Sequence, residues 1–401
     1  MQTDLTISQA IETLYSVLPQ LETETVPLLE ASGRVLAADL TSLVNHPNTD
    51  DSALDGFAVH LESTLNATPT NPVRLRLVGE VAAGAKAYTD VLQPQQAVKV
   101  FTGGAVPKGA TGIAAVEHTA RDGDDVLLLH PAQPEIRHTG QDLETGRVYL
   151  QEGTRLNGAQ LALAAAMGHA KIPVFKRPKV AILPTGDEIY EPGEPLPEGA
   201  VYNAGSYGLY AKLLELGAEP VLLPKVEDNL KSLHKAMLEA SGADLLLTIG
   251  GVSMGERDFV RKLLETEGKP IFWRIKVKPG GPPMLGMLHD LPVFGLPGNP
   301  VSSLVIFDVV VRAALLRRMG CPDTLTTVRA QASTPFKGAG AKLGLWRANL
   351  TWTGEHYGVA AFSNQSSQVL RSLVQSNALA LVPPHETRAV GDWLEVWLLP
   401  N

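Results

Sequence analysis

The chain has 401 residues, of which 44% are hydrophobic and 19% are charged, a composition typical of folded rather than disordered proteins. This length predicts about two to four domains, given the usual size of a domain. The formal net charge of −8 argues against a general nucleic-acid binder, because such proteins neutralise phosphates with Lys and Arg.

Individual residues exclude other classes of protein. Cys321 is the single cysteine, which rules out an internal disulfide and a cysteine-rich zinc or iron–sulfur site. The apolar run of residues 305–316 contains Asp308 and Arg312, so it is too short and too charged to span a bilayer. The first residues show no secretory signal. We therefore expect a soluble, cytoplasmic protein with no membrane and no nucleic-acid partner.

The first half of the chain predicts a short helix and then a β-rich segment. Apolar residues recur at helical spacing over residues 7–18, and Pro19 ends that helix. Short apolar alternations separated by Gly, Pro and Asp clusters then predict a mostly-β lobe over residues 46–149. Leucines and alanines over residues 156–169 predict another helix.

The second half predicts alternating strands and helices. Strands are expected at residues 180–183, 221–223, 244–249, 271–277 and 293–296, and helices at 203–216, 229–240, 258–265 and from 299. This alternation is typical of a doubly wound α/β unit with a mostly parallel sheet. After Pro322, short alternating strands predict a small β-barrel or sandwich.

Four turns of the α/β unit take a buried strand directly into glycine and polar residues. They are residues 184–188, 227–229, 250–258 and 296–302. Because a parallel sheet gathers the carboxyl ends of its strands along one edge, we expect these turns to meet in one crevice. Backbone N–H groups, hydroxyls and carboxylates there suit a phosphorylated ligand and a divalent cation.

Two of these turns are candidate anion sites. Gly250, Gly251 and Ser253 lie between a strand and a helix, where glycines let the backbone approach an anion closely. Residues 297–302 form a second helix start of this kind. A plain tight turn is the alternative, since the first segment lacks the Gly-Lys-Ser/Thr of a P-loop.

The candidate catalytic acids also lie on turns. Glu188, Asp228 and Asp258 fall in the α/β unit, and Asp55 and Asp142 fall in the predicted β lobe. Each has a structural alternative, namely a helix cap in the first group and a turn in the second. Carboxylates in one cleft raise each other's pKa unless a cation is present, and Mg²⁺ takes one or two carboxylates with phosphates and water.

Lys276 and Lys278 are candidate cationic donors. Their spacing of two along a predicted strand puts both side chains on one face, near the end of the strand. Solvated lysines at a strand edge are the alternative.

Taken together, these segments resemble the molybdopterin molybdenumtransferases, namely bacterial MoeA and the E domain of gephyrin, over nearly the whole chain. The matching segments occur in the family's order. They are residues 30–37, 52–59, 101–104, 140–142, 184–188, 250–258, 278–280, 296–302, Arg347, 365–367 and 377–379. No segment is decisive alone, but their joint order is very specific.

The resemblance implies that adenylylated molybdopterin and molybdate react, with Mg²⁺, to give molybdenum cofactor and AMP. The implied catalytic acids are Asp55, Asp142, Glu188, Asp228 and Asp258, of which the last three would bind the metal. Residues of the matching segments would bind the pterin and its phosphates, and Lys278, Arg347 and Ser367 would gather the molybdate. The full set of expected substrate-binding residues is Thr102, Thr185, Gly186, Gly250, Gly251, Ser253, Lys276, Lys278, Pro297, Gly298, Asn299, Ser302, Arg347 and Ser367.

The family also implies four lobes and a homodimer. The lobes would be an elongated N-terminal lobe from residues 1–45 and 150–172, the β-rich lobe at 46–149, a molybdopterin-binding α/β domain at 173–322 and a C-terminal β-barrel at 323–401. In such a dimer Asp55 and Asp142 would face the α/β unit of the other subunit. Periodicity alone does not predict the split N-terminal lobe.

Two departures from the family's pattern concern its loops. The family commonly reads Lys-Pro-Gly-Lys-Pro where this chain has Gly281 in place of the second Lys, which removes one cationic donor. Lys276 is a candidate substitute. Ser366 and Gln368 stand where bacterial members often have Gly, which affects the shape of the local loop.

Two other functions are compatible with parts of the sequence. A pterin-binding or scaffolding homologue without catalysis would fit the missing lysine, but scaffolding needs none of the acids named above. A nucleotide-pyrophosphate hydrolase would share the α/β unit, but it would leave Asp55 and Arg347 unexplained.

Overall fold

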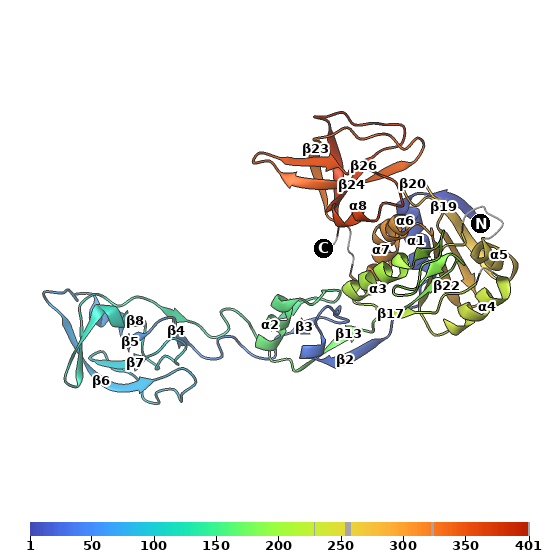
Figure 1. The fold of residues 1–401 in the computed structure, drawn as a ribbon. Helices are drawn as coiled ribbons and strands as arrows, with labels where there is room; N and C mark the ends of the chain where they lie inside the picture. Colours follow the sequence, from blue (N-terminus) through green and yellow to red (C-terminus); the bar gives the residue numbers. More distant parts are fainter. Residues whose placement is uncertain (228, 253–257, 322–324, 400–401) are drawn as a thin grey trace.

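The computed structural model describes residues 1–227, 229–252, 258–321 and 325–399. Figure 1 shows an elongated molecule, with a β lobe at one end, a narrow connecting lobe, and an α/β domain beside a small barrel at the other end. In the described residues no helix is both long and apolar enough to cross a membrane.

A seven-stranded sheet forms the centre of the α/β domain. Its strands are, in spatial order, β1 (Gln2–Leu5), β19 (Lys269–Ile275), β21 (Met284–Leu288), β22 (Leu291–Leu296), β18 (Leu245–Ile249), β14 (Lys179–Pro184) and β17 (Glu219–Leu222). Every strand except β21 runs in the same direction, since β21 pairs antiparallel with both of its neighbours. The prediction of a mostly parallel sheet is confirmed.

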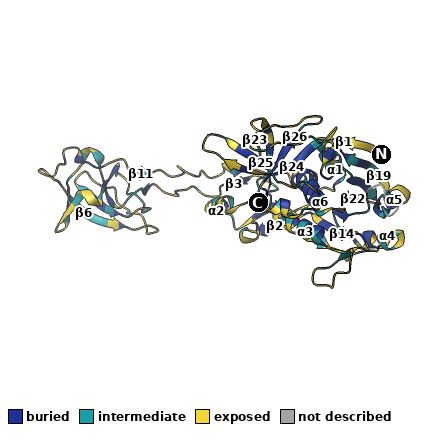
Figure 2. Cartoon of the chain, turned by 45° about the horizontal axis from the view of Figure 1, so that its top comes forward, coloured by how far each residue is buried: buried dark blue, intermediate teal, exposed yellow. Residues whose placement is uncertain are grey.

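Helices cover both faces of this sheet. One face packs on α1 (Ile7–Val17), α3 (Ala204–Leu216), α6 (Pro300–Ile306) and α7 (Arg312–Arg318), and the other on α4 (Leu230–Glu239) and α5 (Phe259–Thr266). Along β14, Val180 and Ile182 face the first core, while Ala181 and Leu183 face the second. Figure 2 shows these central strands in the colour of buried residues. Two-sided burial explains why the strands read as continuous apolar runs.

The first strand and helix pack on the α/β domain. β1 pairs parallel with β19, and α1 lies against α7. Thr6 begins α1 with a capping box, since its hydroxyl accepts from the Gln9 N–H and the Gln9 side chain accepts from the Thr6 N–H. Residues 2–17 thus differ in packing from the rest of 1–45. β1 has only four residues, of which three are polar, so its sequence has no apolar alternation from which a strand could be predicted.

The chain leaves this domain and returns to it through the connecting lobe. There β2 (Thr23–Pro27) pairs with β13 (Lys171–Phe175), β3 (Leu40–Thr41) pairs with β12 (Val148–Leu150), and α2 (Gly158–Ala166) packs into the same core. Segments that are distant in sequence therefore form one narrow lobe.

The β lobe is built on a six-stranded sheet. Its strands are, in spatial order, β8 (Gly112–Ala115), β5 (Gly56–Val59), β7 (Gln96–Val100), β6 (Val73–Val81), β10 (Asp125–Leu128) and β9 (Thr119–Asp122). β4 (Asp51–Ser52) and β11 (Ile136–Arg137) pair beside it, and Arg137 donates to both carboxylate oxygens of Asp51. This ion pair links β4, on the segment that enters the β lobe, to β11, on the segment that leaves it.

The C-terminal barrel closes on itself. β24 (Leu343–Trp352), β25 (Tyr357–Ala361), β23 (Thr327–Ala332), β27 (Trp393–Leu398) and β26 (Ala378–Val382) pair in that order, and β26 pairs again with β24. The short strand β20 (Val277–Lys278) runs parallel to the start of β24 and joins the barrel to the α/β domain. In that register Val277 is opposite Leu343 and Lys278 is opposite Gly344, so the turn that carries Lys278 lies at the junction.

Candidate functional site

The turns at the carboxyl ends of β14, β18 and β22 line one cleft of about 800 Å³, together with the start of α3. Three of the four turns expected to converge therefore do so. Of the predicted site residues, the cleft is lined by Thr185, Gly186, Glu188, Gly250, Gly251, Asp258, Gly298 and Asn299.

Hydrogen bonds between the turns hold the backbone of this cleft. The N–H and the hydroxyl of Thr185 both donate to the carbonyl of Ile249, at 3.2 and 3.0 Å. The N–H of Gly250 donates to the carbonyl of Leu296 at 3.0 Å. Gly250 has a φ of +97°, where a side chain would be strained, and a Cβ added to Gly298 would lie 3.6 Å from the Gly250 Cα. The two glycine turns therefore lie against each other.

Two carboxylates line the cleft, and its described lining residues include no lysine or arginine. Glu188 is exposed, and its carboxylate lies over Gly186, where an added Cβ would be 2.8 Å from Oε2. Asp258 precedes α5, but its side chain makes no capping hydrogen bond to that helix. Asp258 therefore occupies the start of α5 without capping the helix through its side chain. We call this cavity the acidic cleft.

Asp228 and Ser253 lie outside the described residues. Within the described ranges, no group of three or more His, Cys, Asp or Glu side chains is placed to hold a metal ion. The acidic cleft brings together Glu188 and Asp258, two of the three predicted metal-binding acids.

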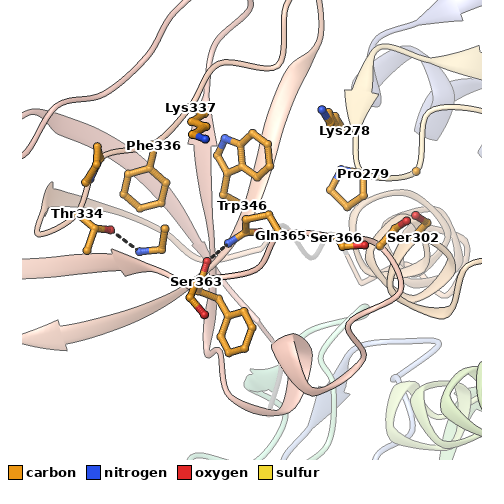
Figure 3. A pocket seen from close by; sticks show the side chains of 15 residues that line it. Lys278, Pro279, Ser302, Thr334, Phe336, Lys337, Trp346, Ser363, Gln365 and Ser366 are labelled. Carbon is orange, nitrogen blue, oxygen red and sulfur yellow. Dashed lines mark hydrogen bonds between the residues drawn. The ribbon is translucent and has the colours of Figure 1, made fainter.

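A second cavity, of about 830 Å³, lies between the Lys278 turn and the barrel. Lys278, Pro279, Gly280 and Ser302 line it from the α/β domain, and residues 334–337, 346, 361–363 and 365–367 line it from the barrel (Figure 3). Among the described residues its lining contains two lysines, Lys278 and Lys337, and no acidic residue, and five of its residues carry hydroxyl groups. We call this cavity the basic pocket, because its charges and donors suit an anion.

Arg347 lies fully buried on β24, behind the barrel wall of the basic pocket. Its Nε donates to the hydroxyl of Ser372 and its Nη2 to the carbonyl of Ser366, each at 3.1 Å. Gln365 accepts from the Arg347 N–H and donates to the Arg347 carbonyl. Burial lowers the pKa of Arg347 to about 10, so the side chain remains a cation at neutral pH. Among the described residues no carboxylate pairs with it, and its Nη1 has no hydrogen-bond partner.

Residues at the start of α6 line both cavities. Pro300 lines the acidic cleft, whereas Ser302 lines the basic pocket. On the barrel side, Gln368 lines the acidic cleft, whereas Ser366 and Ser367 line the basic pocket. A ligand that extends from one cavity to the other would have one end among carboxylates and the other among cations.

The predicted residues of the β lobe lie away from both cavities of the same chain. Asp55 directly precedes β5 in the β lobe, at the other end of the molecule from α6 (Figure 1). Asp142 lies between β11 and β12, next to Leu143, which packs in the core of the connecting lobe. Asp55 is exposed, and its Oδ1 accepts from the N–H and the hydroxyl of Thr102, at 2.7 and 2.8 Å. These bonds, the backbone one first, lower the pKa of Asp55 and keep the carboxylate ionised.

Two further predicted residues line neither cavity. Lys276 is exposed, and its backbone links β1 to the barrel, because its N–H donates to Leu5 and its carbonyl accepts from Leu343. Pro297 is buried, just before Gly298.

Some lining residues were not predicted as site residues. Asn203, which lines the acidic cleft, was expected only as the first residue of the helix over 203–216, although its place as the N-cap of α3 puts it at the cleft edge of the sheet. Lys337 and Gln368 come from barrel loops, whose sequence carries no periodic signal.

Family models describe three consecutive parts of the chain. The model of the MoeA N-terminal region (domain I and II) matches residues 5–168. The model of a probable molybdopterin binding domain matches residues 181–317, and that of the MoeA C-terminal region (domain IV) matches residues 329–399.

Known proteins are similar to this chain over its length. It is 36% identical to molybdopterin molybdenumtransferase 2 of Mycobacterium tuberculosis, over 93% of this chain and 94% of that protein. It is 35% identical to the molybdopterin molybdenumtransferase of Synechococcus elongatus, over 98% of this chain and 99% of that protein. The crystal structure of the molybdopterin biosynthesis moeA protein from Pyrococcus horikoshii matches with a TM-score of 0.84 and 29% identity, over 99% of this chain and 100% of that one.

Replacing Ser372 tests what holds Arg347 in place. Ser372→Ala leaves the buried Nε without an acceptor, so we expect the free energy of unfolding to fall by about 1–3 kcal/mol. The Ser366 loop should also exchange its amide hydrogens faster, because Arg347 is less firmly held against it. Calorimetry and hydrogen exchange measure the two effects. Ser241→Ala, at an exposed position, serves as the control, and equal behaviour of the two variants would contradict the role of Ser372.

Proposed function

Since the chain belongs to the molybdopterin molybdenumtransferase family, we propose that it inserts molybdate into adenylylated molybdopterin, releasing AMP and forming molybdenum cofactor. Such a reaction needs a site for a diphosphate-linked nucleotide and, directly beside it, a site for an oxyanion. The observation that carries the proposal is that residues at the start of α6 line both the acidic cleft and the basic pocket.

In this proposal the acidic cleft holds the adenylylated pterin and its phosphates. Gly250, Gly251 and Gly298 leave room for phosphate oxygens to approach the backbone, as a side chain would not. Asn299 lies beside them at the start of α6, where N–H groups without intrahelical partners favour anions. Thr185, fixed by its two bonds to Ile249, lies beside Gly250 and lines the cleft together with Gly186. Pro297 directly precedes Gly298.

Mg²⁺ is the proposed cofactor, and the described residues fit it. Glu188 and Asp258 offer carboxylate oxygens in a cleft whose described lining has no cationic side chain. Mg²⁺ binds one or two carboxylates together with substrate phosphates and water, so two acids suffice, and Asp228 is the third proposed ligand. When bound, the cation would neutralise charge on the phosphates as a Lewis acid. The protein's own part is to hold two carboxylates beside the glycine turns.

The basic pocket is the proposed site of molybdate. Lys278 and Ser302 come from the α/β domain and Ser367 comes from the barrel, so an anion there would be held from both sides. Arg347 adds a fixed positive charge behind the Ser366 loop. Donors that are in place before the anion arrives stabilise its charge without reorganisation, and they hold it in position beside the pterin.

A cytoplasmic homodimer completes the proposal. Asp55 and Asp142 line neither cavity of their own chain, and the β lobe that carries Asp55 is distant from α6, so a second copy is needed to bring them to a cleft. Thr102 already fixes Asp55 as an ionised carboxylate. Asp55, which Thr102 holds in place as a carboxylate, would orient the substrate bound in the neighbouring subunit.

AMP release from adenylylated molybdopterin tests the proposed function. With Mg²⁺ present, we expect molybdate to stimulate release, because the oxyanion is a reactant. Release that does not depend on molybdate would instead indicate a nucleotide-pyrophosphate hydrolase, and tight binding without release would indicate a scaffold.

Removing the acids of the cleft tests its catalytic role. We expect Glu188→Ala and Asp258→Ala to abolish cofactor formation, because each removes a carboxylate that faces the substrate phosphates, while the melting temperature stays near that of the wild type. Glu198→Ala is the matched control, since Glu198 is exposed outside the cleft. Wild-type turnover in either cleft variant would show that the assignment is wrong.

A further inference from the structure

The basic pocket has a second source of positive charge, on the segment of residues 333–342 that joins β23 to β24. Lys337 lines the pocket from the barrel side, across from the Lys278 turn (Figure 3). Lys342 ends the segment directly before β24. Both side chains are exposed, and within the described part of the chain neither forms an ion pair with a carboxylate.

Lys342 lies where a side chain at position 281 would begin. A Cβ added to Gly281 would be 3.0 Å from the Lys342 Nζ. Gly281 does not have a positive φ, so its backbone conformation is open to other residues, although an added Cβ would also lie 3.2 Å from the Val277 carbonyl oxygen. The absence of a side chain at this position leaves room for the ammonium group of Lys342.

Strand register explains why Lys342 reaches the turn. β20 and β24 pair so that Val277 is opposite Leu343, one residue after Lys342. The turn then folds back, and the N–H of Ile275 donates to the carbonyl of Gly281 at 3.0 Å. Lys342 therefore lies on the flank of the turn whose tip carries Lys278.

The pocket also contains a donor that lacks an acceptor. Trp346 lines the pocket, and its buried indole N–H has no partner among the described residues. Lysine, arginine and indole groups can only donate hydrogen bonds. A wall of donors and cations without a carboxylate favours a guest that carries several acceptor oxygens and a negative charge.

We propose that Lys337, in the wall of the basic pocket, and Lys342, beside that wall at Gly281, together determine the affinity of the pocket for a tetrahedral oxyanion such as molybdate. The inference rests on the proposed function, which places molybdate in this pocket. The ammonium group of Lys342 lies beside Gly281, and it supplies there the positive charge that a lysine at position 281 would carry. Neither Lys342 nor Lys276, considered above as the substitute, is among the residues that line the pocket, but the Lys342 ammonium lies beside Gly281, directly after the lining residue Gly280.

Molybdate binding to the full-length protein, measured by isothermal titration calorimetry, tests the proposal. We expect Lys337→Ala and Lys342→Ala each to raise the Kd for molybdate roughly tenfold, as for the loss of an ammonium group close to an anion. Both variants should also show a weaker dependence on salt. Lys231→Ala is the control, because it removes one exposed lysine on α4, and it should leave the Kd unchanged. A Kd that changes in neither variant, or in only one, overturns the joint role of the two lysines.

A double-mutant cycle tests the geometry at Gly281. Gly281→Ala should displace the Lys342 ammonium and raise the Kd roughly threefold in the wild-type background. In the Lys342→Ala background the same change should have no further effect, and Gly281→Lys should restore binding. Equal effects of Gly281→Ala in both backgrounds would overturn the proposed contact. If molybdate binds as expected but never stimulates AMP release, the proposed function fails while this inference stands.

Discussion

The separation of negative from positive charge at the start of α6 is the feature on which the rest of the site depends. A phosphate-bound cation needs carboxylates, and a molybdate anion needs cations, so one undivided cavity could not serve both. In the proposed reaction two cavities would divide these tasks, one lined by Glu188 and Asp258 and the other by Lys278 and Lys337. A single residue separates Pro300, which lines one cavity, from Ser302, which lines the other, so that the two ligands would be neighbours.

The basic pocket exists because the barrel is joined to the α/β domain by strand pairing. β20 and β24 form a short parallel ladder across the junction, which fixes the Lys278 turn against the barrel wall. β24 also carries Arg347, whose buried charge is held by Ser372 and the Ser366 carbonyl. A buried cation without a carboxylate partner is costly, and a bound oxyanion would compensate for it. The barrel thus has a chemical role in the proposed site.

Sequence analysis predicted the α/β domain well and the barrel side of the site poorly. Continuous apolar strands and glycine-bearing turns follow directly from a sheet that is buried on both faces, so the acidic cleft could be predicted from residues such as Glu188, Gly250 and Gly298. Lys342 could not, because its position depends on the register between strands that are distant in sequence. β1 escaped detection for a similar reason, since pairing with β19, not its own apolar pattern, makes it a strand.

Locating the two ions in one crystal would test the separation of charge most directly. Crystals of the protein with AMP, Mn²⁺ in place of Mg²⁺, and molybdate would give separate anomalous signals for manganese and molybdenum. The account predicts manganese between Glu188 and Asp258 and molybdenum beside Lys278, Ser302 and Ser367, on opposite sides of the start of α6. Both metals in one cavity, or molybdenum among the carboxylates, would contradict it.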